Sequence, residues 1–149
     1  MAQDAGDTGG PYLAVAVLCE HALEEKDGVQ SLIRIVDRLE VKVVGPDAPD
    51  ELPPGAVKTN LVLHLRGGQA RGRGTIRLVM EKPSGQRSEM SRLPVYFEPE
   101  ERVNRIVVDL TINVQGEGLY WIDVIHEEQG RLLTRIPLRL IYKPIRSSS

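Results

Sequence analysis

The chain has 149 residues, one cysteine and a formal net charge of −2 at pH 7, with 41% hydrophobic and 27% charged residues. This balance is typical of one globular domain with its own core and excludes a disordered chain. The slightly acidic composition speaks against nucleic acid as the main partner, because phosphate binding usually needs a basic surface. A single thiol excludes an internal disulfide and is typical of a reducing compartment.

The first eleven residues are small, polar and rich in glycine, so we expect a flexible tail over residues 1–11. Residues 13–19 are apolar at every position, as in a strand buried on both faces. This stretch is too short to span a bilayer, and no Lys or Arg precedes it as in a secretory signal. The sequence therefore predicts a first strand, no membrane partner and a cytoplasmic protein.

Residues 20–28 form a charged connector that ends in the turn signal Asp27-Gly28. Residues 29–44 then alternate between apolar and polar side chains. The spacing of Leu32, Val36 and Leu39 also fits a helix, but the many β-branched residues favour a strand. We expect one long strand, with a bulge near Asp37 that shifts its phase.

A proline-rich stretch over residues 45–56 predicts an extended loop. The same alternation returns in residues 57–66, 75–81, 93–97, 106–114, 120–124 and 132–140. Short glycine-rich connections favour antiparallel neighbours, and Pro137 places the last strand at a sheet edge or a bulge. About eight strands predict a two-sheet antiparallel β-sandwich over residues 12–143, with a tail at 144–149. A partly open β-barrel is the alternative.

Two segments resemble a known family. Residues 25–38 (EKDGVQSLIRIVDR) follow Leu18-Cys19-Glu20, and residues 118–124 (GLYWIDV) accompany residues 133–142 (LTRIPLRLIY). Together they resemble a family of short bacterial proteins known as a domain of unknown function. The resemblance covers most of residues 13–142. It implies an immunoglobulin-like β-sandwich of bacterial origin, and it implies no catalytic residues because none is assigned to the family.

The charged connector is the first candidate site, because it holds side chains that bind metal ions. They are Cys19, Glu20 and His21, followed by Glu24, Glu25 and Asp27. No C-x-x-C, H-x-x-H or D-x-D spacing accompanies them. We therefore predict a buried cysteine followed by a solvated charged loop, with no metal and no cofactor.

Arginines mark two further segments. Arg34, Asp37 and Arg38 predict a structural ion pair, unless a bulge turns Asp37 outward. Residues 66–77 (RGGQARGRGTIR) are similar to RGG segments that bind nucleic acid. They lack interleaved aromatic residues, however, so we expect a hairpin with soluble arginines.

Trp121 lies on the opposite parity from its apolar neighbours Tyr120 and Ile122. Either both faces of this strand are covered, or Trp121 is exposed as an interface anchor. The alternation alone does not choose between these two interpretations.

Catalytic motifs do not appear: there is no nucleophile elbow, P-loop or dinucleotide fingerprint. We expect a non-enzymatic binding or scaffolding module whose partner is another protein or a second copy. Its expected surface comprises Trp121 with Glu20, His21, Glu24, Glu25 and Asp27. The alternatives are a C2-like module that binds ions or lipids through end-loop carboxylates, a homo-oligomeric structural protein, and an enzyme built on Cys19 and His21.

Overall fold

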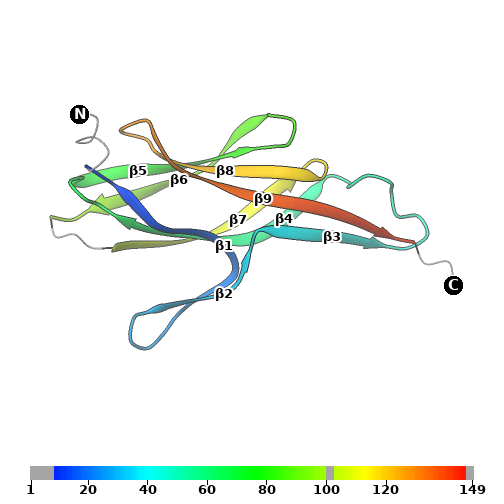
Figure 1. Cartoon of the computed structure of the whole chain (residues 1–149), viewed down its shortest axis with the longest axis horizontal. Coiled ribbons are helices and arrows are strands. Elements are labelled where there is room, and N and C mark those ends of the chain that lie inside the picture. The colour runs from blue at the N-terminus through cyan, green and yellow to red at the C-terminus, as the bar shows by residue number, and fades with distance from the viewer. Residues whose placement is uncertain (1–8, 100–102, 147–149) are drawn as a thin grey trace.

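The computed structural model describes residues 9–99 and 103–146, and every regular element in these ranges is a β-strand (Figure 1). The predicted all-β class is therefore confirmed. The strands are β1 (Tyr12–Glu24), β2 (Gln30–Val36), β3 (Arg38–Val44), β4 (Gly55–Arg66), β5 (Gly72–Glu81), β6 (Arg87–Phe97), β7 (Val103–Val114), β8 (Gly118–His126) and β9 (Arg131–Ile145).

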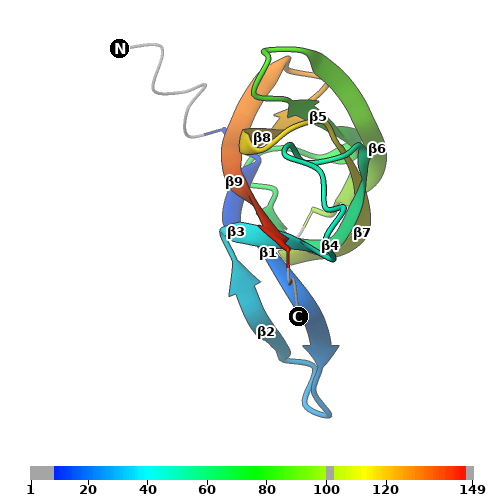
Figure 2. The same ribbon diagram turned by 90° about the vertical axis from the view of Figure 1, so that its right-hand side faces the viewer.

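The strands form two sheets with the orders β2-β1-β4-β7 and β3-β9-β8-β5-β6. Figure 2 shows that the sheets curve around a common interior, so that the sandwich approaches a partly open barrel. The strand pairings of the described residues are antiparallel, as expected, except that β3 runs parallel to β9. This parallel pair corrects the prediction of a purely antiparallel sandwich.

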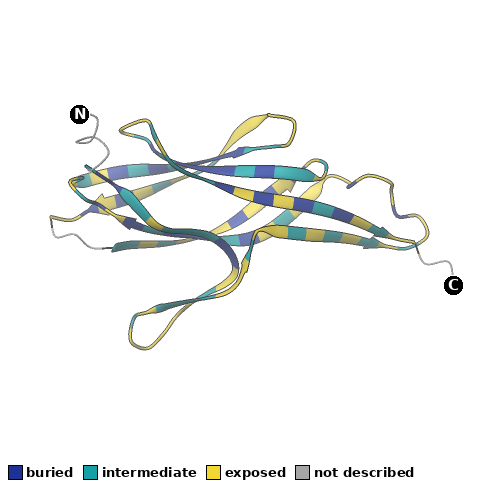
Figure 3. Cartoon of the chain, viewed as in Figure 1, coloured by how far each residue is buried: buried dark blue, intermediate teal, exposed yellow. Residues whose placement is uncertain are grey.

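The core lies between the sheets and follows the predicted alternation (Figure 3). Leu61, Leu63 and Leu65 of β4 are completely buried, and so is Tyr120 of β8. The Tyr120 hydroxyl donates to the carbonyl of Gly116 at 2.6 Å and accepts from the amide of Gln115 at 2.8 Å. A buried tyrosine whose hydroxyl bonds back to the backbone of the preceding turn is known as a tyrosine corner.

The prediction of a single long strand over residues 29–44 is wrong. This segment forms β2 and β3, which belong to different sheets, and Asp37 lies at the break. Val36 and Leu39 both pack against the core, although an odd spacing would place them on opposite faces of a straight strand. The chain bends at Asp37, whose carbonyl accepts a hydrogen bond from the Arg139 amide at 3.1 Å.

Other boundaries also differ from the prediction. β9 lies between β3 and β8, so it is an interior strand. Its pairing with β3 begins only at Arg139, so Pro137 sits where β9 lacks that neighbour. β9 extends to Ile145, beyond the expected domain end, and residues 147–149 of the predicted tail lie outside the described residues. Of the N-terminal tail, residues 1–8 lie outside them too, while the Gly9 carbonyl accepts a bond from the Gln69 amide at 2.6 Å.

Within the ranges that the structure describes, no helix has the length and apolar character needed to cross a membrane.

Candidate functional site

The candidate site is built where β1 separates from β4. β1 pairs with β4 as far as Cys19 opposite Asn60, and then continues with β2 as its sole neighbour in the sheet. Residues 20–36 form a hairpin that bends away from the sandwich (Figures 1 and 2). We call this hairpin the arm.

The bend follows from the side-chain parity of β1. Leu18 points into the core, so in a straight strand Glu20 would point the same way, opposite the buried Thr59. Burying an unpaired carboxylate is strongly unfavourable. The strand turns out instead, and Glu20 forms an ion pair with Arg34 of β2. Arg34 has a φ of 57°, a left-handed conformation that non-glycine residues rarely adopt.

Two side chains of β4 hold the backbone of β1 at this point. The Thr59 hydroxyl donates to the Cys19 carbonyl at 3.2 Å, and the Asn60 side-chain amide donates to the Glu20 carbonyl at 2.7 Å. Both bonds satisfy carbonyls that the departing strand would otherwise leave beside the sheet. The bend is therefore a built feature of the fold.

The tip of the arm is tied back to the outer face of the first sheet. The ring nitrogen Nε2 of His64 lies 2.6 Å from the side-chain oxygen of Gln30, and Arg105 donates to the Gly28 carbonyl at 3.2 Å. Val62, which shares this face with His64, has no exposed surface. Burial lowers the pKa of His64, and the nearby charge of Arg105 lowers it further.

The opposite face of the arm is apolar and exposed. Large hydrophobic side chains there have exposed fractions of 46% for Leu23, 57% for Val29, 40% for Ile33 and 63% for Ile35. The remaining exposed large hydrophobics of the described residues are spread over other elements: Val44, Tyr96, Val107, Leu132 and Ile145. Among these, Val44 of β3 lies directly opposite Ile145 of β9, so the arm holds the larger group of exposed apolar side chains.

Acidic residues surround the turn of the arm. The Ser31 hydroxyl donates to the Glu25 carboxylate at 2.7 Å, and the Val29 amide donates to the Asp27 carboxylate at 3.0 Å. Glu24 is exposed at the end of β1. The predicted residues Glu20, His21, Glu24, Glu25 and Asp27 therefore do lie together, but residues 20–24 are strand rather than the expected loop.

The geometry of this segment supports neither a metal site nor a reactive cysteine. No group of three or more His, Cys, Asp or Glu residues able to hold a metal ion occurs in the described part of the chain. Cys19 is completely buried, and burial raises the pKa of its thiol. A reactive cysteine needs the reverse, a lowered pKa and access to solvent.

Trp121 lies apart from the arm, on the outer face of the second sheet. It is half-buried, and the guanidinium carbon of Arg135 lies 4.7 Å from its ring centroid. Both earlier interpretations are too simple, because Trp121 is neither a core residue nor a free anchor. It is covered by a cation that belongs to an ionic network.

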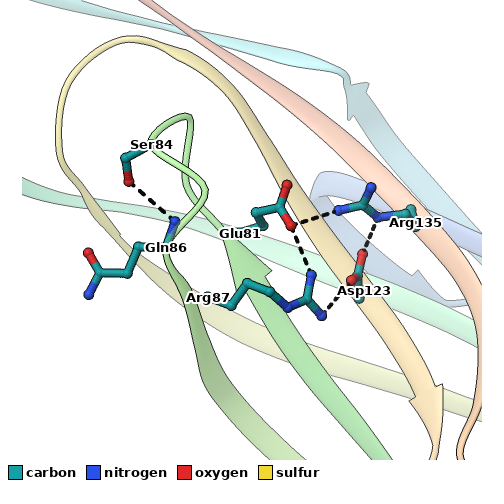
Figure 4. A network of polar contacts seen from close by, with 6 residues as sticks. All are labelled: Glu81, Ser84, Gln86, Arg87, Asp123 and Arg135. Atoms are coloured by element: carbon teal, nitrogen blue, oxygen red, sulfur yellow. Dashed lines mark hydrogen bonds and ion pairs between the residues drawn. The ribbon is translucent and has the colours of Figure 1, made fainter.

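This network joins the four strands β5, β6, β8 and β9 (Figure 4). Asp123 is buried, and its two carboxylate oxygens lie 2.7 Å from Arg135 Nε and 2.9 Å from Arg87 Nη2. Glu81 contacts the same two arginines at 2.9 and 3.3 Å. Hydrogen bonds to Asp123, the largest cause, raise the pKa of Arg87 and Arg135. The two cations balance the two anions, so the charged groups of this face are bound to one another rather than left for a partner.

Two other arginines that the sequence singled out, Arg34 and Arg71, lie in structural contacts. Arg34 pairs with Glu20 and not with the predicted Asp37, which is exposed, as is Arg38. Arg71 donates to the carbonyls of Gly68 and Ala70 at 2.7 and 2.8 Å, and so closes the turn before β5. The prediction of a hairpin for residues 66–77 is wrong, because β4 and β5 belong to different sheets and the glycine- and arginine-rich segment crosses from one sheet to the other.

The arm itself was missed by the sequence analysis. Its apolar residues alternate like those of a core strand, and alternation does not reveal which strands are covered. The available signal is Glu20, a carboxylate on the inward parity of an otherwise apolar strand.

Comparison of the sequence with models of protein families found no match, and a search of curated proteins found no matching sequence. Function is therefore inferred from the geometry of the site.

Proposed function

We propose that the chain is a non-enzymatic protein-binding module that contacts its partner through the apolar face of the arm. One observation carries this proposal: Leu23, Val29, Ile33 and Ile35 are exposed together on one projecting hairpin. Apolar surface is stabilised by removal from water at about 25 cal/mol per Å². The fold gains nothing for its own stability by presenting these four side chains to water.

The chemistry of the arm also describes the partner. Glu24, Glu25 and Asp27 add negative charge at the turn, next to the apolar face. A complementary surface therefore has an apolar centre bordered by lysine or arginine. Ile33 and Ile35 lie on β2, which is the edge strand of its sheet, so backbone pairing with a partner strand is compatible with the same contact.

The test is affinity purification from a bacterial lysate with wild type, an arm variant and a control variant. The arm variant is Leu23→Lys combined with Ile35→Lys. The control is Val44→Lys, which alters a 70% exposed valine at the far end of β3. We expect a protein that wild type and the control retain and the arm variant loses. Recovery of the same proteins by all three would remove the proposal.

A purified partner then gives a direct measurement by calorimetry. Loss of two apolar contacts predicts an affinity at least about tenfold weaker for the arm variant. If the partner is a second copy, light scattering will show a dimer that the arm variant lacks.

A further inference from the structure

β4 has a free edge over part of its length. Its ladder with β7 covers all twelve residues, from Gly55 opposite Val114 to Arg66 opposite Val103. Its ladder with β1 begins only at Asn60. In the described sheets, residues 55–59 therefore have no strand on this side, and a free edge presents backbone donors and acceptors to a further strand.

The core is open beside this edge. Leu39, Val41 and Val43 of β3 and Val57 of β4 pack against the core but stay only partly buried. Leu61, further along β4 where β1 covers the edge, is completely buried. β3 is the edge strand of the second sheet and lies beside β4 (Figure 2). We call this opening between β3 and residues 55–59 the seam.

A hollow of about 540 Å³ adjoins the seam and includes residues of four strands. Glu20 and His21 of β1 line one side, Leu39 of β3 lines another, and Thr59 and Leu110 contribute from β4 and β7. Because walls from two sheets surround the edge, the space suits a single extended segment better than the edge of another folded sheet.

Charges of both signs border the seam: Lys58 and Asp109 line the hollow, together with Glu20, whose carboxylate is bound by Arg34. Arg38 and Lys42 of β3 and Lys58 of β4 are exposed there. The acidic residue between them, Glu40, is engaged by Lys143 at 2.9 Å. A segment lying in the seam would meet apolar side chains on its inner face and the exposed ammonium of Lys58 on its outer face, whereas Glu40 offsets the charges of Arg38 and Lys42.

We propose that the seam binds one extended segment of a partner protein by β-strand addition to residues 55–59. Apolar side chains of the segment alternate inward onto Val57 and Leu39, and acidic side chains lie outward beside Lys58. The segment takes the place that β1 would hold if it continued straight, which Glu20 prevents. This site is distinct from the apolar face of the arm and does not rest on the function proposed above.

The test uses the full chain and a fluorescent synthetic peptide of alternating valine and glutamate, followed by fluorescence anisotropy. Hydrogen exchange of the complex locates the contact. We expect binding, slower exchange at residues 55–59, and about tenfold weaker binding by Lys58→Glu, because charge attraction becomes repulsion. Lys58 is exposed, so this variant keeps the fold. Val107→Lys, which alters the 47% exposed valine on β7, is the control and should bind like wild type.

Three results would each overturn the proposal. They are absence of binding up to about 1 mM peptide, protection only at another edge such as β2 or β6, and equal affinity of wild type and Lys58→Glu. A peptide with proline in place of the central valine lacks one backbone donor and should bind more weakly. None of these results depends on the apolar residues of the arm.

Discussion

Glu20 and Arg34 face each other across the two strands of the arm, at the point where the arm leaves the sandwich. Glu20 is the carboxylate that interrupts the inward parity of β1. Arg34 is the non-glycine residue with positive φ in the described part of the chain. The carboxylate at the bend of β1 is thus bound by the residue of β2 that has the left-handed backbone.

Arg34 provides a test of this backbone strain. The left-handed conformation costs a residue with a Cβ atom about 1–2 kcal/mol, and glycine avoids that cost. We expect Arg34→Gly to change the urea midpoint little, because relief of strain offsets the lost ion pair. Arg34→Val should lower it clearly, because a β-branched residue disfavours positive φ and also lacks the charge. Equal midpoints for the two variants would show that the backbone here is not strained.

His64 predicts a loss of stability in acid. Its pKa in the folded state is lowered by burial and by Arg105, so the unfolded state binds the proton more readily. The contribution of His64 is complete above its ordinary pKa of about 6.5 and falls as the pH drops through the folded pKa. Urea midpoints between pH 7.5 and 5 should decline less in His64→Gln than in wild type. Parallel declines would assign the effect to other groups.

Substitution of Asp123 tests how much the ionic network contributes to the free energy of unfolding. In Asp123→Asn the two arginines lose their shared buried anion. Breaking a fully buried pair costs about 3–5 kcal/mol. The side chains of Arg87 and Arg135 are 45% and 35% exposed, so solvent screening reduces the expected loss to about 2 kcal/mol. Denaturant unfolding measures it, with Glu89→Gln on the same face as a control that should change stability by less than about 1 kcal/mol.

Substitution of Tyr120 tests how much the tyrosine corner contributes to the free energy of unfolding. Tyr120→Phe keeps the buried ring but removes the hydroxyl that bonds Gly116 and Gln115. Burial raises the pKa of this hydroxyl, so it remains protonated and able to donate. The expected loss is about 1–2 kcal/mol of unfolding free energy. Tyr96→Phe, at a 54% exposed ring, should be neutral; a similar loss there would show that the corner has no special role.

The sequence by itself determined the all-β class, the two-sheet arrangement and most strand positions. These depend on local alternation, because a strand places successive side chains on opposite faces whatever lies beyond them. The same pattern in residues 29–36 wrongly indicated a covered strand continuous with β3.

Only the tertiary structure decided which strands lie together. The break at Asp37 places β2 and β3 in different sheets. The parallel pairing of β3 with β9 and the network around Asp123 join residues that are distant in sequence. The acidic candidates on the arm were identifiable from the sequence as a charged cluster, whereas the exposed apolar face beside them was not. Exposure is decided by the neighbouring sheet, and the departure of β1 at Glu20 leaves both that face of the arm and the edge of β4 uncovered.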